Sequence, residues 1–329
     1  MSGVGYDDQA RIPENQYAGW RGDVPFHQVR VHPACLCRDT GWHAGSRFNH
    51  EIRHAIGHPA GDAQDKRRAS RLLRDRGPAV PAADPAYPLP RTTVWSYGSA
   101  NHPDTFNYPA FTIEARYGRP VRVKWINDLK DADGNFLPHL LAVDPMLHWA
   151  NPPGGAAGRD MRPSFASTPG PYTGPVPIVT HLHGGHSAQE SDGYAEAWYL
   201  PAANDIPAGF ASEGTWYEFF KSEFSSKFGE VWEPGTATFQ YENDQRASTF
   251  WYHDHTLGMT RLNVYAGPAG FYLLRRGPGD LPDPVLPGPA PEVGADPFGR
   301  FYEVPIAIQD RSFNADNHDR RLVAECCLS

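Results

Sequence analysis

The chain has 329 residues, which is enough for one large domain or two domains of ordinary size. Its 38 acidic and 30 basic side chains give a net charge of −8, which argues against nucleic acid and against an anionic membrane surface as the main partner. No apolar run reaches the roughly 18 residues of a membrane-spanning helix, and no apolar leader is visible near the start, so a cytoplasmic location is the default expectation.

Residues 1–84 lack a regular apolar pattern. They hold six of the 15 histidines, at spacings that match neither a helix nor a strand. We expect this segment to be an irregular, poorly ordered extension. A histidine-rich metal-binding tail is the minor alternative.

Residues 85–276 have the composition of a β-rich domain. Glycine and proline make up about a fifth of the chain, and aromatic residues make up 12%, which favours strands joined by turns. Alternating or β-branched stretches predict strands, and the long connection 186–214 between two of them is typical of a functional or mobile loop. The expected strands are 92–97, two strands on either side of the turn at 118–120, 176–183, 215–220, 235–242, 249–255 and 264–275.

The end of the chain predicts a second domain that begins without being completed. Residues 277–300 are rich in proline and glycine, which is typical of a linker between domains. Within 301–329, residues 301–310 form one more predicted strand, and a polar tail follows. A single strand is too little to fold as a domain.

Two His-x-His pairs are the strongest functional pattern. His253 and His255 end an aromatic stretch, and His181 and His183 end a β-branched one. Because side chains alternate along a strand, both histidines of each pair leave the same face. Imidazoles gathered in this way are typical ligands of copper or zinc. Asp254, between two of these histidines, is expected to face the other side and to act as an orienting or structural group.

The other histidines near these motifs are expected to be ordinary residues. We expect His186 to lie in a loop and His139 and His148 to be structural. A zinc-dependent hydrolase is a further reading of residues 181–186, because they resemble an H-x-H-x-D-H motif. However, Gly185 stands where that motif has an aspartate ligand.

The sequence around the two His-x-His pairs resembles the first domain of multicopper oxidases of the bacterial laccase, bilirubin-oxidase and spore-coat type. The resemblance extends from about residue 88 to 314. Besides HLHGG and WYHDH, it is carried by PLPRTTVWSYG (88–98), GRPVRVKWIN (118–127), SDGYAEAW (191–198), TRLNVYAGPAGFYLL (260–274) and IAIQDRSFN (306–314). It implies an all-β fold, a cupredoxin-like Greek-key β-sandwich. It also implies copper-dependent oxidation of phenolic or other aromatic substrates, coupled to reduction of O₂ to water.

The resemblance also implies a role for each matching residue. His181 would bind the type 2 copper of a trinuclear cluster, and His183, His253 and His255 would bind the type 3 pair. Asp192 matches an acidic residue that assists proton delivery to O₂ intermediates. A carboxylate beside cationic metals suits that role, because O₂ reduction consumes protons.

The departures from the family pattern limit what the chain is expected to do alone. Only half of the cluster's eight histidines are present, and neither Cys326 nor Cys327 is flanked by a histidine as a type 1 copper cysteine would be. We therefore expect a truncated chain with little or no oxidase activity unless a second chain or a missing C-terminal part completes the cluster. A non-catalytic copper-binding module is the alternative. Family members are often exported or coat-bound, which leaves the location open.

Overall fold

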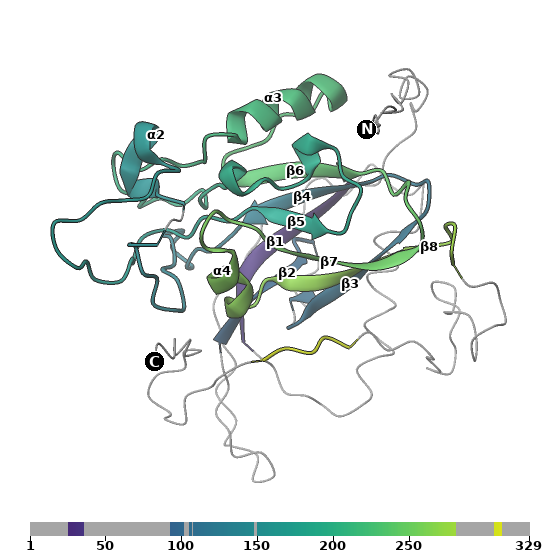
Figure 1. Ribbon diagram of the computed structural model, residues 1–329, viewed down its shortest axis with the longest axis horizontal. Coiled ribbons are helices and arrows are strands. Elements are labelled where there is room, and N and C mark those ends of the chain that lie inside the picture. The colour runs from purple at the N-terminus through teal and green to yellow at the C-terminus, as the bar shows by residue number, and fades with distance from the viewer. Residues whose placement is uncertain are drawn as a thin grey trace, which may run out of the picture.

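A computed structural model of the chain describes six stretches, which are residues 26–35, 93–101, 105–106, 108–147, 150–280 and 306–310. Their strands form two four-stranded sheets that face each other (Figure 1). The first sheet contains β1 (Phe26–Cys35), β2 (Thr93–Ser99), β4 (Val121–Asn127) and β6 (Thr236–Tyr241). Its strand order is β2-β1-β4-β6, with β1 antiparallel to β2 and parallel to β4.

The second sheet carries both predicted histidine pairs. It contains β3 (Ala110–Arg116), β5 (Thr180–His183), β7 (Ser248–Asp254) and β8 (Ala269–Arg275), in the order β3-β8-β7-β5. β7 is antiparallel to both β5 and β8, and β3 is parallel to β8. The His-x-His strands are therefore direct neighbours although they are distant in the sequence.

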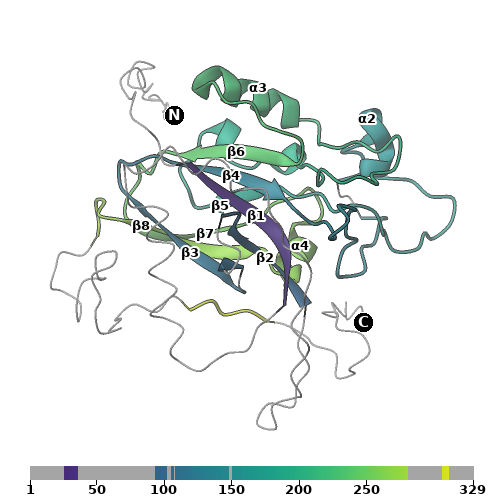
Figure 2. The same cartoon turned by 180° about the vertical axis from the view of Figure 1, so that it is seen from behind.

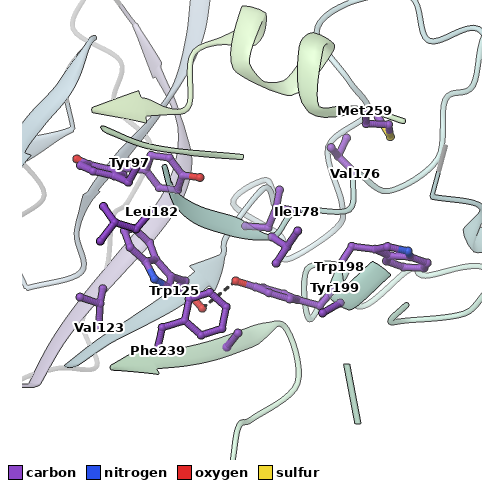
Figure 3. Packing of buried hydrophobic residues seen from close by; sticks show 14 of the residues in the cluster. Tyr97, Val123, Trp125, Val176, Ile178, Leu182, Trp198, Tyr199, Phe239 and Met259 are labelled. Atoms are coloured by element: carbon purple, nitrogen blue, oxygen red, sulfur yellow. Dashed lines mark hydrogen bonds between the residues drawn. The ribbon is translucent and has the colours of Figure 1, made fainter. Parts of the chain in front are cut away.

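Alternating side chains from both sheets fill the space between them. Along β4, every second residue from Val121 is buried, as expected for a strand with one face toward a core. Figure 3 shows Trp125 from this strand beside Leu182 of β5, and the hydroxyl of Tyr199 donates a hydrogen bond to the carbonyl of Trp125 at 3.3 Å. The prediction of an all-β, cupredoxin-like β-sandwich is confirmed.

Short helices decorate the sandwich. They are η2 (Pro152–Gly154), α2 (Gly155–Gly158), η3 (Gln189–Ser191), η4 (Ala195–Ala197), α3 (Tyr217–Phe228) and α4 (Thr260–Ala266), where η marks a 3-10 helix. Both views place α3 over the outer side of β6, and α4 at one end of the sandwich, where it contacts β7 (Figures 1 and 2). No helix in the described stretches is long and apolar enough to cross a membrane.

The predicted strand at 215–220 is wrong, because helix α3 begins there. Its aromatic residues favour a strand by propensity, but Tyr217, Phe220 and Phe224 are buried at spacings of three and four, which places them on one face of a helix. The helix ends at Gly229, whose φ of 71° is favourable for glycine at this position.

The predicted single strand at 264–275 is also wrong in its first half. Residues up to Ala266 belong to α4, and only β8 is a strand. Gly267 separates the two elements with a φ of 143°, and a Cβ at this position would lie 2.0 Å from the carbonyl oxygen of Trp95. Only glycine fits this close approach between backbones.

Two further expectations for the ends of the chain need correction. The expected irregular extension contains β1, which pairs between β2 and β4 and gives the first sheet its continuity. Residues 306–310, part of a predicted strand, are not in a strand. Most of the linker 277–300 and the rest of 301–329 lie outside the described residues, so the division into domains stays a prediction.

Candidate metal centre

The four predicted ligand histidines meet at the paired ends of β5 and β7. In the antiparallel register, His181 lies opposite His253, and His183 lies opposite Trp251. His255 follows the last residue of β7, and its N–H donates to the carbonyl of Val179 at 2.7 Å, which keeps it against the chain that enters β5. The strand pairing thus gathers both pairs on one side, as the alternation predicts.

The imidazole rings form one cluster. The ring centroids of His181 and His255 are 4.9 Å apart, those of His183 and His253 are 5.4 Å apart, and His181 lies 5.7 Å from both His183 and His253. His253 is buried, His181 and His255 are partly buried, and His183 is exposed. The cluster therefore opens toward solvent on the side of His183.

Hydrogen bonds fix which ring nitrogens are free to bind a ligand. His181 Nδ1 lies 2.6 Å from the carbonyl oxygen of Asp192, and His253 Nδ1 lies 2.7 Å from that of Asp254. A carbonyl only accepts, so both Nδ1 atoms carry the proton and both Nε2 atoms keep a lone pair. His255 Nδ1 is buried and has no hydrogen-bond partner among the described residues. A metal ion would satisfy such an atom directly.

One pair of nitrogens has the spacing of two ligands of a single ion. His183 Nδ1 lies 3.2 Å from His253 Nε2. Two imidazole nitrogens at roughly 2.0 Å from one tetrahedral ion would be about 3.3 Å apart. Since His253 Nε2 is the acceptor, His183 Nδ1 is the donor, and an ion bound between them would take the place of that proton.

The cluster is not a closed metal cage. Within the described stretches, no three histidine, cysteine, aspartate or glutamate side chains are arranged to hold one ion. The donors are instead available in twos, and imidazole nitrogens suit copper well. The residues present therefore fit a copper centre whose coordination is completed by further ligands.

Burial keeps two of the four imidazoles, those of His253 and His255, neutral and ready to bind. Desolvation, with a smaller contribution from the neighbouring histidines, lowers the pKa of His253 to about 4, although the hydrogen bond to the Asp254 carbonyl acts in the opposite direction. Desolvation likewise lowers the pKa of His255, with His181 as the next cause. Neutral imidazoles are the form that binds metals.

Asp254 lies on the opposite face, as predicted, and is fully buried. Its carboxylate accepts hydrogen bonds from the backbone N–H of Val179 and Thr256, the Thr256 hydroxyl and the Asn263 amide, at 2.8–3.1 Å. Burial raises the pKa of Asp254 to about 6, although these hydrogen bonds act in the opposite direction. The residue ties the end of β7 to the chain entering β5 and to α4.

Asp192 lies beside the cluster, half-exposed. Its Oδ1 is 3.6 Å from His181 Nδ1, the atom that donates to the Asp192 carbonyl. Burial raises the pKa of Asp192, and the charges of His181 and His255 would lower it. Gly193, with a φ of 77°, brings this loop so close that a Cβ would lie 2.0 Å from the carbonyl oxygen of Thr180.

Trp251 forms a wall of the cluster. Its ring stacks on His253 with centroids 4.0 Å apart and planes 28° apart, and it lies 5.3 Å from His183. Its side chain is exposed and does not belong to the hydrophobic core. Its position follows from the register that places it opposite His183.

The remaining histidines in the motifs are not part of the cluster. His186 is exposed, and its Nδ1 lies 3.0 Å from Asp244 Oδ1. His139 is buried against Trp95, with ring centroids 4.6 Å apart, and is bonded to Asn263. His148 lies outside the described residues. Sequence reasoning had expected a structural role for His139 but had not connected it with Asn263.

Several known proteins are similar to the chain in sequence. No family model matches it. A laccase of Bacillus stratosphericus is 34% identical over 228 residues, and a laccase of Bacillus subtilis (strain 168) is 31% identical over 228 residues. A multicopper oxidase of Arabidopsis thaliana is 32% identical over the same length. The matched part of the chain belongs to the multicopper oxidase family.

The match covers a larger share of this chain than of its relatives. It takes in 69% of this chain but only 31% of each Bacillus laccase and 29% of the Arabidopsis multicopper oxidase. The chain thus spans about a third of the length of these multicopper oxidases.

Solved structures in the same family are also similar to the chain. A multicopper oxidase from Pediococcus acidilactici has 11% identity and a TM-score of 0.33, with 77% of this chain and 26% of that one covered. A multicopper oxidase from Campylobacter jejuni has 12% identity and the same TM-score, with 76% and 25% covered. The family assignment rests on the sequence matches.

Proposed function

We propose that the chain contributes four copper ligands, His181, His183, His253 and His255, to a laccase-like multicopper oxidase. The observation that carries this proposal is the spacing of 3.2 Å between His183 Nδ1 and His253 Nε2, which suits two ligands of one ion. The relatives named laccase and multicopper oxidase support copper over zinc. Gly185, in the position of the missing acidic ligand, disfavours the zinc hydrolase.

The reaction is oxidation of a phenolic or other aromatic substrate by O₂. Four substrate molecules each lose one electron and one proton, and one O₂ takes up the four electrons and four protons to give two water molecules. Bound copper would supply the one-electron redox chemistry. Burial holds His253 and His255 neutral, and the carbonyl groups of Asp192 and Asp254 orient the rings of His181 and His253.

The finer assignments follow the family pattern. His181 is proposed as the type 2 ligand and the other three histidines as type 3 ligands. Asp192 is proposed to pass protons toward O₂, and its contact with His181 supports that position. The remaining ligands and the electron-entry site are proposed to come from a missing C-terminal part or a second chain, because the chain spans about a third of its relatives.

A copper titration tests the proposal. We expect Cu(II) to bind the purified chain. His253→Ala should weaken binding about 100-fold, because it removes the buried imidazole that would share an ion with His183. The matched control is His186→Ala, in the same motif as His181 and His183 but bonded to Asp244, which should change affinity less than twofold. Equal affinities in both variants would refute the proposed site.

Activity separates the enzyme from a non-catalytic copper-binding module. The copper-loaded chain alone is expected to oxidise a phenol slowly or not at all. Addition of the missing part of a homologous oxidase should restore turnover if the chain is an oxidase component. Copper binding without turnover in any such combination would favour the binding module.

A further inference from the structure

A buried chain of hydrogen bonds runs from the loop before α2 to the candidate ligands. Its inner end is the carboxylate of Asp254, which accepts from Val179, Thr256 and Asn263. Each of its two oxygens has two donors, because the Thr256 hydroxyl also lies 2.9 Å from Oδ1. A carboxylate held by this many fixed donors has only one stable orientation.

Asn263 is the middle of the chain and is fully buried in α4. Its Nδ2 donates to Asp254 Oδ2 at 2.8 Å and to the carbonyl of Pro177 at 3.1 Å. Its Oδ1 lies 3.1 Å from Nε2 of His139. The Nδ2 group and the Oδ1 atom of this amide therefore both have hydrogen-bond partners, so the amide cannot flip without losing them.

His139 sets the direction of the whole chain. The N–H of Leu141 donates to His139 Nδ1 at 2.9 Å, so that nitrogen is an acceptor and the proton lies on Nε2. Nε2–H then donates to Asn263, whose amide donates in turn to Asp254. Burial lowers the pKa of His139 to about 4, so the imidazole stays neutral at ordinary pH.

The network contacts the backbone of both histidine-bearing segments. Val179, which donates to Asp254, directly precedes β5, and its own carbonyl accepts the N–H of His255. Asp254 lies between His253 and His255, and its carbonyl holds Nδ1 of His253. A change at Asn263 would thus be transmitted to both strand ends without contact with any ligand ring.

We propose that His139 and Asn263 are positioning residues of the four-histidine cluster and act through Asp254. The proposal rests on the proposed function, since it assigns the cluster to copper. Groups that orient metal ligands through hydrogen bonds typically change metal affinity 10- to 100-fold when removed. In this chain, His139 and Asn263 would act on the histidine rings through Asp254, whose side chain lies on the opposite face of β7.

Two substitutions and their controls test this proposal by Cu(II) titration and by the EPR spectrum at saturation. Asn263→Leu removes both of its links, and we expect it to weaken Cu(II) binding about tenfold and to shift the copper hyperfine coupling. His139→Leu should act in the same direction. His139→Gln keeps an acceptor for Leu141 and a donor for Asn263, so it should restore wild-type affinity and spectrum.

The matched control for lost stability is Tyr272→Phe. Tyr272 lies on β8, in the same sheet as β5 and β7. The substitution removes a buried hydrogen bond of 2.8 Å from its hydroxyl to Asn243. It should lower the melting temperature as His139→Leu does, yet leave the copper affinity and spectrum unchanged. Wild-type affinity and spectrum in both Asn263→Leu and His139→Leu would overturn the proposal. If Asn263→Leu does not fold, the two His139 variants make the same comparison.

A metal-free measurement separates this proposal from the proposed function. ¹⁵N NMR of the histidine rings should show the proton of His253 on Nδ1 in the wild type and a mixture of tautomers in Asn263→Leu and His139→Leu. If the wild type bound no copper but this change occurred, the copper function would fail and the positioning role would stand. An unchanged His253 tautomer in the two variants would overturn the positioning role.

Discussion

The two sides of the β7 end differ in how fully their polar atoms are satisfied. On one side, His255 Nδ1 has no partner among the described residues, and His183 and His253 share a single hydrogen bond. On the other side, one residue away, each oxygen of Asp254 has two donors. The first side is left ready for a ligand, whereas the second is complete without one.

This difference suggests a division of work along one strand. A fully bonded carboxylate on the buried face restrains the backbone, so the imidazoles on the other face keep their places with a single mutual hydrogen bond, between His183 and His253. Preorganisation of this kind lowers the cost of gathering ligands around an ion. Disturbing the fully bonded side should therefore have a larger effect than disturbing the ligand side.

The largest effect is expected from Asp254→Ala. It leaves the backbone N–H groups of Val179 and Thr256 and one N–H of the Asn263 amide buried without an acceptor, and each costs roughly 1–3 kcal/mol. We expect the free energy of unfolding in urea to fall by about 3–5 kcal/mol. Asp254→Asn keeps the shape and one acceptor oxygen and should lose less. A loss below about 1 kcal/mol for Asp254→Ala would show that the buried side does not restrain the strand.

The next effect concerns pH and His139. Its pKa is about 4 in the folded protein and about 6.5 when unfolded, so the unfolded chain binds the extra proton first. The contribution of His139 to the stability of the metal-free protein should therefore be full above pH 6.5 and fall toward pH 4, by up to roughly 3 kcal/mol. Urea unfolding of His139→Gln across this range should show a shallower slope. The same slope in both proteins would contradict the buried neutral state.

The smallest effect is expected on the ligand side, from Trp251→Phe. An aromatic contact of this kind is worth about 0.5–1.5 kcal/mol, so Cu(II) affinity should fall only a few-fold. Bound Cu(II) should quench Trp251 fluorescence strongly because the indole stacks on His253. The copper-dependent quenching should shrink in Trp251→Phe and persist in Trp216→Phe, an exposed tryptophan at the start of α3. Equal quenching in both variants would place the ion away from His253.

Local pattern predicted the strands that carry the histidines but not every element. β4 and β6 alternate apolar and polar residues, and β7 is rich in aromatic residues, which favour strands. α3 was missed because aromatic propensity for strands outweighed the helical spacing from Tyr217 to Phe224. β1 was missed because Pro33 interrupts its short alternation, and its pairing depends on distant strands.

The candidate site was likewise predictable from the sequence only in part. His-x-His spacing on a strand fixes the face of each pair, and antiparallel pairing then brings His181 opposite His253. The supporting residues have no comparable spacing. Asn263 lies in the short helix α4 and His139 in a loop 124 residues earlier, and only the fold brings them together. The sequence around Asn263, TRLNVYA, mixes polar and apolar residues, so no local feature marks its amide as buried.

Pulsed EPR of the chain with less than one equivalent of Cu(II) tests the central claim most directly, because it counts the imidazoles bound to each ion. The shared spacing of His183 and His253 predicts nitrogen couplings from two imidazoles, reduced to one in His183→Ala and unchanged in His186→Ala. Couplings that do not respond to His183→Ala or His253→Ala would contradict a copper site at the paired ends of β5 and β7.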